Sequence, residues 1–153
     1  ARFGFSDIIT CLLALDAYVE LYHGGMVPIK EFAARPVHRD DRDILVRVVI
    51  KKDGRKAAYI SQRNSSTDFP LLAVCAANLG NQWFVSIGAR PAKAALVEFT
   101  EDNFDTIKEM AKQAADAVSY GDNTRGSGQY RHSLAVVYVR RLMERLKGRS
   151  VSR

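Results

Sequence analysis

Apolar residues recur along most of the chain in short runs that are typical of β-strands. These runs alternate apolar with polar residues or are almost continuously apolar, and many of their side chains are β-branched or aromatic. The runs cover residues 18–22, 27–29, 44–51, 56–62, 71–79, 82–88 and 93–99. Turn signals such as His23-Gly24-Gly25, Asp53-Gly54 and Gly80-Asn81 separate several of them. The pattern predicts strands joined by tight turns.

Three other stretches have the spacing of helices. Ser6-Asp7 precedes apolar residues 8–15, and a Ser or Asp in that place accepts hydrogen bonds from the free N–H groups of a helix start. Thr100, followed by Glu101, Asp102 and Asp105, predicts a second helix with Thr100 as N-cap and an apolar stripe from Phe104 to Val118. Residues 133–146 carry the pattern of a third helix.

The order of the elements, strands first and two helices last, predicts an α+β protein. An antiparallel sheet with helices packed on one face, a two-layer sandwich, is the simplest arrangement that buries these apolar faces. Residues 30–32 are expected to begin a loop or turn, and residues 33–43, 63–70 and 120–128 are expected to be loops. A weak domain boundary falls near residues 53–56.

Charge is distributed unevenly along the chain. The net charge is +6, and residues 127–153 carry 7 basic groups against 1 acidic group, whereas the rest of the chain is nearly balanced. Basic side chains are favoured at the C-terminal end of a helix, where the backbone dipole is negative. A nucleic-acid surface would have the same charge, but no aromatic residues interleave these late arginines as stacking would require. We therefore favour a helix end followed by a tail.

The composition argues against several other classes of protein. The longest apolar runs are far shorter than the roughly 20 residues that a membrane span needs, and no signal-peptide pattern is present, so we expect a cytoplasmic protein. Cys11 and Cys75 lie in apolar runs and are expected to be buried thiols rather than metal ligands. No CxxC pair and no paired histidines suggest a metal site, and we read the acidic residues Asp40, Asp41 and Asp43 as solvated.

No catalytic motif is present: the sequence lacks GxSxG, HExxH, a P-loop and GxGxxG. Trp83 is expected in the core. The glycine-bearing stretch 125–128 is read as a loop, although its N–H groups could cradle an anion. Residues 64–68 hold more hydrogen-bonding side chains than a plain turn needs, which makes this loop the best candidate for a ligand or partner contact. From the residues alone, the chain is a soluble α+β domain.

Four groups of residues resemble a known family. They are Ser6-Asp7-Ile8-Ile9 with residues 12–17; Arg63 to Asp68 with residues 69–73; Gly88-Ala89-Arg90-Pro91; and Tyr120-Gly121-Asp122, Ser127, Tyr130-Arg131 and Arg140-Arg141. In this order they resemble the C-terminal part of the FAD-binding, or medium, subunit of molybdenum hydroxylases of the xanthine dehydrogenase and carbon monoxide dehydrogenase type. The resemblance implies that residues 1–54 are the C-terminal remnant of a FAD-binding domain. Residues 55–148 would form the C-terminal domain of such flavoproteins, and 149–153 a tail.

The resemblance implies a role in electron transfer. In such enzymes a molybdopterin subunit hydroxylates the substrate, an iron–sulfur subunit relays electrons, and FAD passes them to an acceptor such as NAD. The family's AGGT-type and TIGGN-type loops, which hold most of the flavin, are absent from this sequence. We therefore expect the isolated chain to be inactive and colourless, and to bind FAD weakly or not at all. The substrate stays open, with a slight preference for the bacterial xanthine dehydrogenase branch.

Four cofactor-binding residues follow from the resemblance, each with a plainer alternative. Asp7 matches an aspartate that contacts FAD, but it also suits a helix start. Ile44 and Leu45 match a strand position that approaches the flavin ring, but Leu45 also suits a core. Tyr59 falls near the position of a lysine or aromatic residue beside the ring, and it also suits a strand surface. No catalytic or metal residue is implied.

Two other functions stay open. The chain could be an interaction domain that keeps the fold but has lost flavin binding. Less in keeping with the sequence, it could be a basic nucleic-acid-binding domain.

Overall fold

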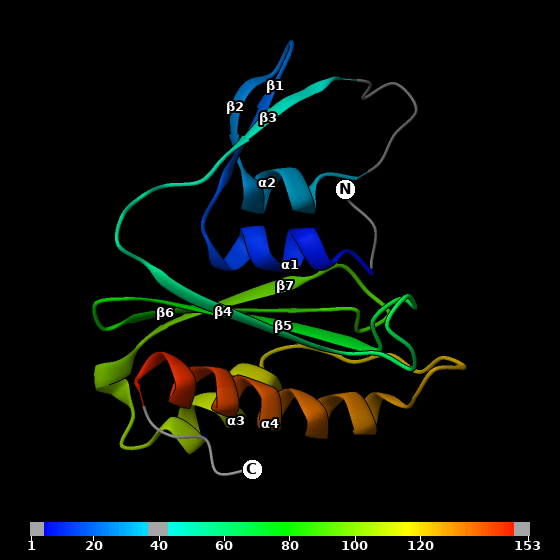
Figure 1. The fold of residues 1–153 in the computed structure, drawn as a ribbon, viewed down its shortest axis with the longest axis vertical. Helices are drawn as coiled ribbons and strands as arrows, with labels where there is room; N and C mark the ends of the chain where they lie inside the picture. The colour runs from blue at the N-terminus through cyan, green and yellow to red at the C-terminus, as the bar shows by residue number, and fades with distance from the viewer. Residues whose placement is uncertain (1–4, 37–42, 149–153) are drawn as a thin grey trace.

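The computed structural model describes residues 5–36 and 43–148, and in this part of the chain two antiparallel sheets are stacked with helices (Figure 1). A three-stranded sheet has the order β2-β1-β3, and a four-stranded sheet has the order β4-β5-β6-β7. The strands are β1 Tyr18–Leu21, β2 Gly25–Pro28, β3 Leu45–Val49, β4 Lys56–Gln62, β5 Leu72–Leu79, β6 Gln82–Gly88 and β7 Ala95–Thr100. The helices are α1 Asp7–Ala14, α2 Ile29–Ala34, α3 Ile107–Asp116 and α4 Gly128–Leu146, with a 3₁₀ turn at Glu101–Asn103.

The main core lies between the four-stranded sheet and the helices α3 and α4. Successive strand residues point to opposite faces of a sheet, and on β5 the alternate residues Leu72, Val74 and Ala76 face this core. Trp83 of β6 is fully buried there, as expected, and its indole N–H donates to Glu101. This half of the molecule is the two-layer sandwich that the strand and helix order predicts.

Helix α1 covers the other face of the same sheet, so the sheet is buried on both sides (Figure 1). The residues at this contact are small, which lets the helix approach closely. A Cβ atom added to Gly88 of β6 would lie 2.2 Å from the Oγ1 of Thr10 on α1. Above α1, a second core joins α1, α2 and the three-stranded sheet through side chains that include Leu13, Val19 and Phe32.

The prediction of an α+β fold is confirmed, and the four strands of the larger sheet are found where the pattern placed them. Helix α1 begins as predicted, because the Ser6 hydroxyl accepts a hydrogen bond from the N–H of Ile9. The expected loop at residues 33–43 is wrong at Ala33 and Ala34, which belong to α2, and its residues 37–42 lie outside the described part of the chain. The expected tail 149–153 lies wholly outside it.

Several predictions of local structure are wrong. Residues 30–32 do not begin a loop but belong to α2, which buries Ile29, Phe32 and Ala33 at helical spacing. Thr100 does not cap α3: it is the last residue of β7, where it pairs with Gln82, and it precedes the 3₁₀ turn Glu101–Asn103 without a side-chain cap bond. Helix α2 has six residues and α3 has ten, and both are too short for their hydrophobic period alone to identify their boundaries.

The true caps lie at residues that the pattern passed over. Thr106 caps α3 in a capping box: its hydroxyl accepts from Glu109 N–H, and the Glu109 carboxylate accepts from Thr106 N–H. Helix α4 begins at Gly128 rather than at residue 133, with the Ser127 hydroxyl accepting from the N–H of Tyr130. The glycine at the helix start obscured this boundary, because glycine disfavours a helix interior.

Candidate functional site

Asp7, Tyr59 and Arg63 meet at the N-terminal end of α1. The Tyr59 hydroxyl donates to Oδ1 of Asp7, and the same oxygen lies 2.6 Å from Nη2 of Arg63. Asp7 is placed by the start of α1, whereas Tyr59 comes from β4 and Arg63 directly follows that strand. The structure therefore brings together two of the four predicted cofactor-binding residues, Asp7 and Tyr59.

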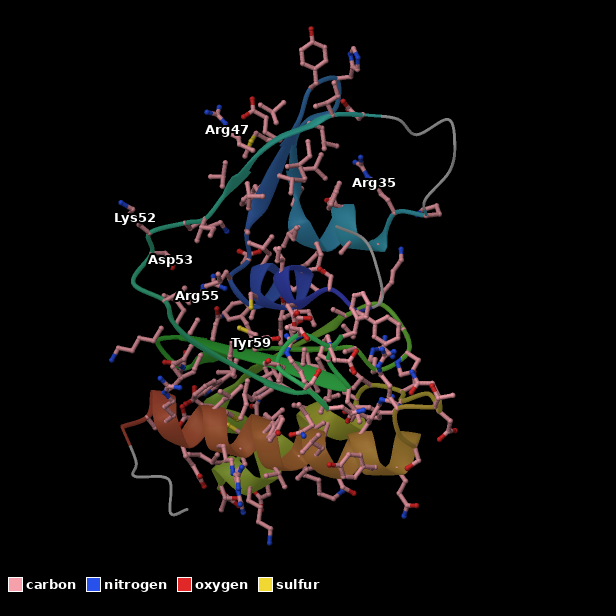
Figure 2. All side chains as sticks on the ribbon, turned by 45° about the vertical axis from the view of Figure 1, so that its right-hand side comes forward. Arg35, Arg47, Lys52, Asp53, Arg55 and Tyr59 are labelled. Atoms are coloured by element: carbon pink, nitrogen blue, oxygen red, sulfur yellow. The ribbon has the colours of Figure 1, made fainter. Side chains whose placement is uncertain are left out.

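Tyr59 lies on the α1 side of the sheet, next to the contact between helix and strand (Figure 2). It packs against a small cluster formed by Ala14, Cys75 and Ala77. Burial, followed by the hydrogen bond to Asp7, raises the pKa of Tyr59 from 10.0 to about 12. The phenol therefore stays protonated at neutral pH and serves as a hydrogen-bond donor.

Asp7 retains a partly exposed carboxylate in this cluster. Its side chain is 36% exposed, and that of Arg63 is 25% exposed. The pKa of Arg63 is raised, chiefly by its hydrogen bond with Asp7. The site thus presents a carboxylate, a guanidinium and an aromatic ring at one edge of the α1–β4 contact, a combination that suits a ligand with hydroxyl groups and a flat ring.

The loop of residues 64–68 is tied to the same cluster. Nη1 of Arg63 donates to the Asp68 carbonyl at 2.8 Å, and the Asp68 carboxylate lies 2.9 Å from Nη2 of Arg125. The Arg125 hydrogen bond and the Phe69 N–H lower the pKa of Asp68. Phe69 is 62% exposed, and Cζ of Arg125 lies over its ring, 5.8 Å from the ring centre. Two cations therefore hold this loop at Asp68, and Phe69 beside it offers an exposed aromatic surface.

Arg63 and Arg125 were missed as site residues by the sequence reasoning. Arg63 is the first residue of the stretch 63–68, and the resemblance of that stretch to the flavoprotein family could have identified it as a site residue. Arg125 is 57 residues away from Asp68 in the chain, so no local pattern indicated their pairing. In the stretch 125–128, the N–H of Arg125 donates to Asn123 and the N–H of Gly128 donates to Asp122, so these two N–H groups bind neighbouring side chains rather than an anion.

Ile44 and Leu45 lie in a different part of the molecule, at the start of β3 in the three-stranded sheet. The Ile44 carbonyl accepts from the N–H of Tyr22, which holds it beside the β1–β2 turn. Both side chains are largely exposed, at 69% for Ile44 and 39% for Leu45. The interpretation of Leu45 as a core residue is wrong, because β3 is an edge strand that packs little against α2. The strand region instead exposes several apolar side chains, which also include Val46, Val48 and Ile50.

A second concave region lies between α2 and β7 and contains the cations Lys30, Arg90 and Lys93. Each of the three is already engaged. Lys93 Nζ donates to the last carbonyls around the end of α2, Lys30 pairs with Glu98 at 2.8 Å, and Arg90 donates to Ser119. These interactions close the end of α2 onto the sheet, and they assign this region a structural role.

Of the acidic residues considered as metal ligands, Asp43 lies within the described residues. Asp43 accepts from the N–H groups of His23 and Gly24 and so closes the β1–β2 turn, while Asp40 and Asp41 lie outside the described residues. Within residues 5–36 and 43–148, no three His, Cys, Asp or Glu side chains gather in a way that could hold a metal ion. No helix in those ranges is both long and apolar enough to cross a bilayer.

Comparisons with known proteins give structural matches only. No family model matches the sequence, and no curated protein matches it. The fold is similar to a chain of quinoline 2-oxidoreductase from Pseudomonas putida 86, with a TM-score of 0.76 and 19% identity over 96% of this chain and 58% of that one.

Two carbon monoxide dehydrogenases are similar as well. The enzyme from Hydrogenophaga pseudoflava, in a form that lacks the Mo-pyranopterin moiety of its molybdenum cofactor, gives a TM-score of 0.73 at 17% identity, over 98% of this chain and 60% of that one. The reconstituted enzyme from Oligotropha carboxidovorans gives 0.70 at 17% identity, over 97% of this chain and 59% of that one. The chain therefore shares its fold with chains of these enzymes and spans about three fifths of their length.

Proposed function

We propose that this chain is the C-terminal part of the FAD-carrying subunit of a molybdenum hydroxylase. One observation carries the proposal: at least 96% of the chain follows the fold of chains from quinoline 2-oxidoreductase and carbon monoxide dehydrogenase. The sequence independently resembles flavoprotein subunits of this class in four ordered groups of residues. The fold and the sequence thus favour the same enzyme class.

In this proposal, residues 1–54 are the remnant of a FAD-binding domain and residues 55–148 form the C-terminal domain that covers the flavin. The subunit's partners would be a molybdopterin subunit and an iron–sulfur subunit, with an acceptor such as NAD. FAD, when bound, would supply the redox chemistry by taking up electrons and passing them on. The substrate would meet the molybdopterin subunit, so this chain would not select it.

The residues present fit a flavin. Tyr59 provides a half-buried aromatic ring at the α1–β4 contact, and its protonated hydroxyl holds the Asp7 carboxylate in place. The exposed part of Asp7 can accept from a ligand hydroxyl group, and Nη2 of Arg63 lies 2.6 Å from the same carboxylate. Hydrogen bonds to a carboxylate are stronger than those between neutral groups. We assign Asp7 to binding the flavin, and Tyr59 and Arg63 to holding the Asp7 carboxylate in position.

Ile44 and Leu45 contribute a second, apolar surface. Exposed apolar patches of this kind commonly mark a place where a ligand or another protein surface binds. Val46, Val48 and Ile50 are exposed as well, so apolar side chains are open to solvent along the whole of this strand region. We propose that this surface is covered in the complete subunit, with Ile44 and Leu45 on the side of the flavin.

The proposal can be tested through flavin retention. In the complete subunit, Asp7→Ala should lower the FAD content after gel filtration by several-fold, while Asp105→Ala, an exposed aspartate at the other helix-bearing face, should leave it unchanged. Absorbance of the flavin, relative to protein, gives the readout. Equal flavin content in the two variants would remove Asp7 from the site. A complete subunit that carries no flavin at all would favour an interaction domain instead.

A further inference from the structure

Cys11 of α1 and Cys75 of β5 face each other across the contact between the helix and the four-stranded sheet. Both are free thiols in the structure, and they belong to one small cluster with Ala14 and Ala77. The Cys11 side chain packs against the cluster that contains Cys75, next to the contact of α1 with β5. The two residues are 64 positions apart in the chain, and only the packing of α1 on the sheet brings them together.

The close packing of α1 makes a covalent bond between the two sulfurs geometrically reasonable. A disulfide needs Cα atoms that are roughly 4.4–6.8 Å apart, nearer than most helix–sheet contacts allow. Here the sheet presents small residues to the helix, since Cys75 pairs with Ser86 and Ala73 with Gly88. The short distance between α1 and the sheet is evident at Gly88, where an added methyl group would collide with the hydroxyl of Thr10.

The two thiols differ in exposure and in acidity. Cys11 is partly exposed, whereas Cys75 is 2% exposed. The hydrogen bond from Cys75 lowers the pKa of Cys11, while the same interaction and burial raise the pKa of Cys75. Because the thiolate is the reactive form of cysteine, Cys11 is suited to react first and Cys75 second.

We propose that Cys11 and Cys75 form a peroxide-sensitive thiol pair, with Cys11 as the reacting thiol and Cys75 as the resolving thiol. The oxidant is hydrogen peroxide. The Cys11 thiolate attacks one peroxide oxygen, the S–O bond forms, the O–O bond breaks, and hydroxide leaves, which gives a sulfenic acid. The Cys75 sulfur then attacks the Cys11 sulfur; the S–S bond forms, the S–O bond breaks, and water leaves with the Cys75 proton.

The disulfide would tie α1 to β5 next to the candidate site. Tyr59 pairs directly with Cys75 in the β4–β5 register, and Asp7 lies one helical turn before Cys11 on the same face of α1. Oxidation would therefore hold the helix that carries Asp7 against the strands that position Tyr59. This inference concerns thiol chemistry alone, and it does not depend on the proposed flavin function.

The test uses the chain itself, treated with a modest excess of hydrogen peroxide and then denatured. We expect both thiols to be lost together in a thiol-counting assay, the intact mass to fall by about 2 Da, and a reductant to restore both thiols. Proteolytic mapping should recover a peptide pair joined through Cys11 and Cys75. Because this measurement uses the unmodified protein, it does not depend on whether a variant folds.

Two variants separate the roles of the thiols. In Cys75→Ala, whose new side chain matches the neighbouring Ala73 and Ala77, peroxide should leave Cys11 as a sulfenic acid that a dimedone-type reagent traps. In Cys11→Ala, Cys75 should react far more slowly than Cys11 does in the parent chain. The proposal is overturned if the parent chain gains about 32 Da at Cys11 while Cys75 keeps its thiol, or if Cys75 in Cys11→Ala oxidises at the parent rate.

Discussion

Arg55 joins the C-terminal end of α1 to the four-stranded sheet by donating from Nη1 to the carbonyl of Ala14 at 2.9 Å. Its guanidinium also lies 4.2 Å from the centre of the Phe84 ring, and its side chain is only 5% exposed. Asp53 pairs with it at 3.2 Å on the segment that leads from β3 to β4 (Figure 2). One side chain therefore fixes the relation between the helix, the sheet and the connection between the two sheets.

Replacing Arg55 with Met should lower the free energy of unfolding by about 2 kcal/mol, because the change removes a cation–π contact and a charged donor to a helix-end carbonyl. Urea unfolding followed by tryptophan fluorescence measures the difference. Lys52→Met is the matched control: Lys52 is exposed on the same segment and should change stability by less than about 0.5 kcal/mol. Equal values for the two variants would contradict the role given to Arg55.

The raised pKa of Tyr59 predicts a stability effect at high pH. Because its folded pKa of about 12 exceeds the ordinary 10.0, the folded chain holds this proton more tightly than the unfolded chain. The stabilisation is fully present below pH 10 and is lost as the pH rises through 12. Tyr59→Phe should remove it, so that the stabilities of the parent and the variant converge over this interval.

A spectrophotometric titration of tyrosinate gives the same pKa without unfolding the protein. The difference between the parent curve and the Tyr59→Phe curve should have a midpoint near 12. Asp7→Asn should move this midpoint downwards, because the hydrogen bond and the charge of Asp7 both contribute to the shift. A difference curve centred at 10 would show that Tyr59 is neither buried nor paired as described.

Gly88→Ala should destabilise the fold by about 1–3 kcal/mol, because the added methyl group overlaps the hydroxyl of Thr10 and would push α1 away from the sheet. The double variant Thr10→Ala with Gly88→Ala should recover part of the loss, since the colliding oxygen is then absent. Gly121→Ala is the control, because the new atom would sit 3.5 Å from Pro91, an ordinary contact. Thermal unfolding of the four proteins decides the matter, and a lack of recovery in the double variant would count against this packing.

Thr106→Ala should cost about 1 kcal/mol of stability, because it removes the hydroxyl that caps α3 and half of the capping box. Thr100→Ala should cost less, since Thr100 makes no side-chain cap bond and ends a strand instead. Urea unfolding of both variants compares the two positions directly. A larger loss at Thr100 than at Thr106 would restore the assignment that the sequence pattern suggested.

The candidate site was partly predictable from the sequence. Asp7 and Tyr59 were identified through the resemblance to flavoprotein subunits, and the structure brings them together at α1 and β4. Arg63 belonged to a resembling stretch but had no assigned role, and its pairing with Asp7 spans 56 residues. Ile44 and Leu45 were identified in the same way as Asp7, yet they lie in the other sheet, which no local pattern distinguished.

By itself the sequence determined the local elements. The alternation of apolar residues produces the strands, because side chains of a strand point to opposite faces, and Ser6 starts α1 through a bond three residues away. The tertiary structure alone decided which faces meet. The packing of α1 on the second face of the sheet, which joins Asp7 to Tyr59 and Cys11 to Cys75, depends on side-chain sizes at Gly88 and its neighbours. Such contacts between distant segments depend on how side chains fit together in three dimensions, and the periodic pattern of apolar residues along the chain gives no information about that fit.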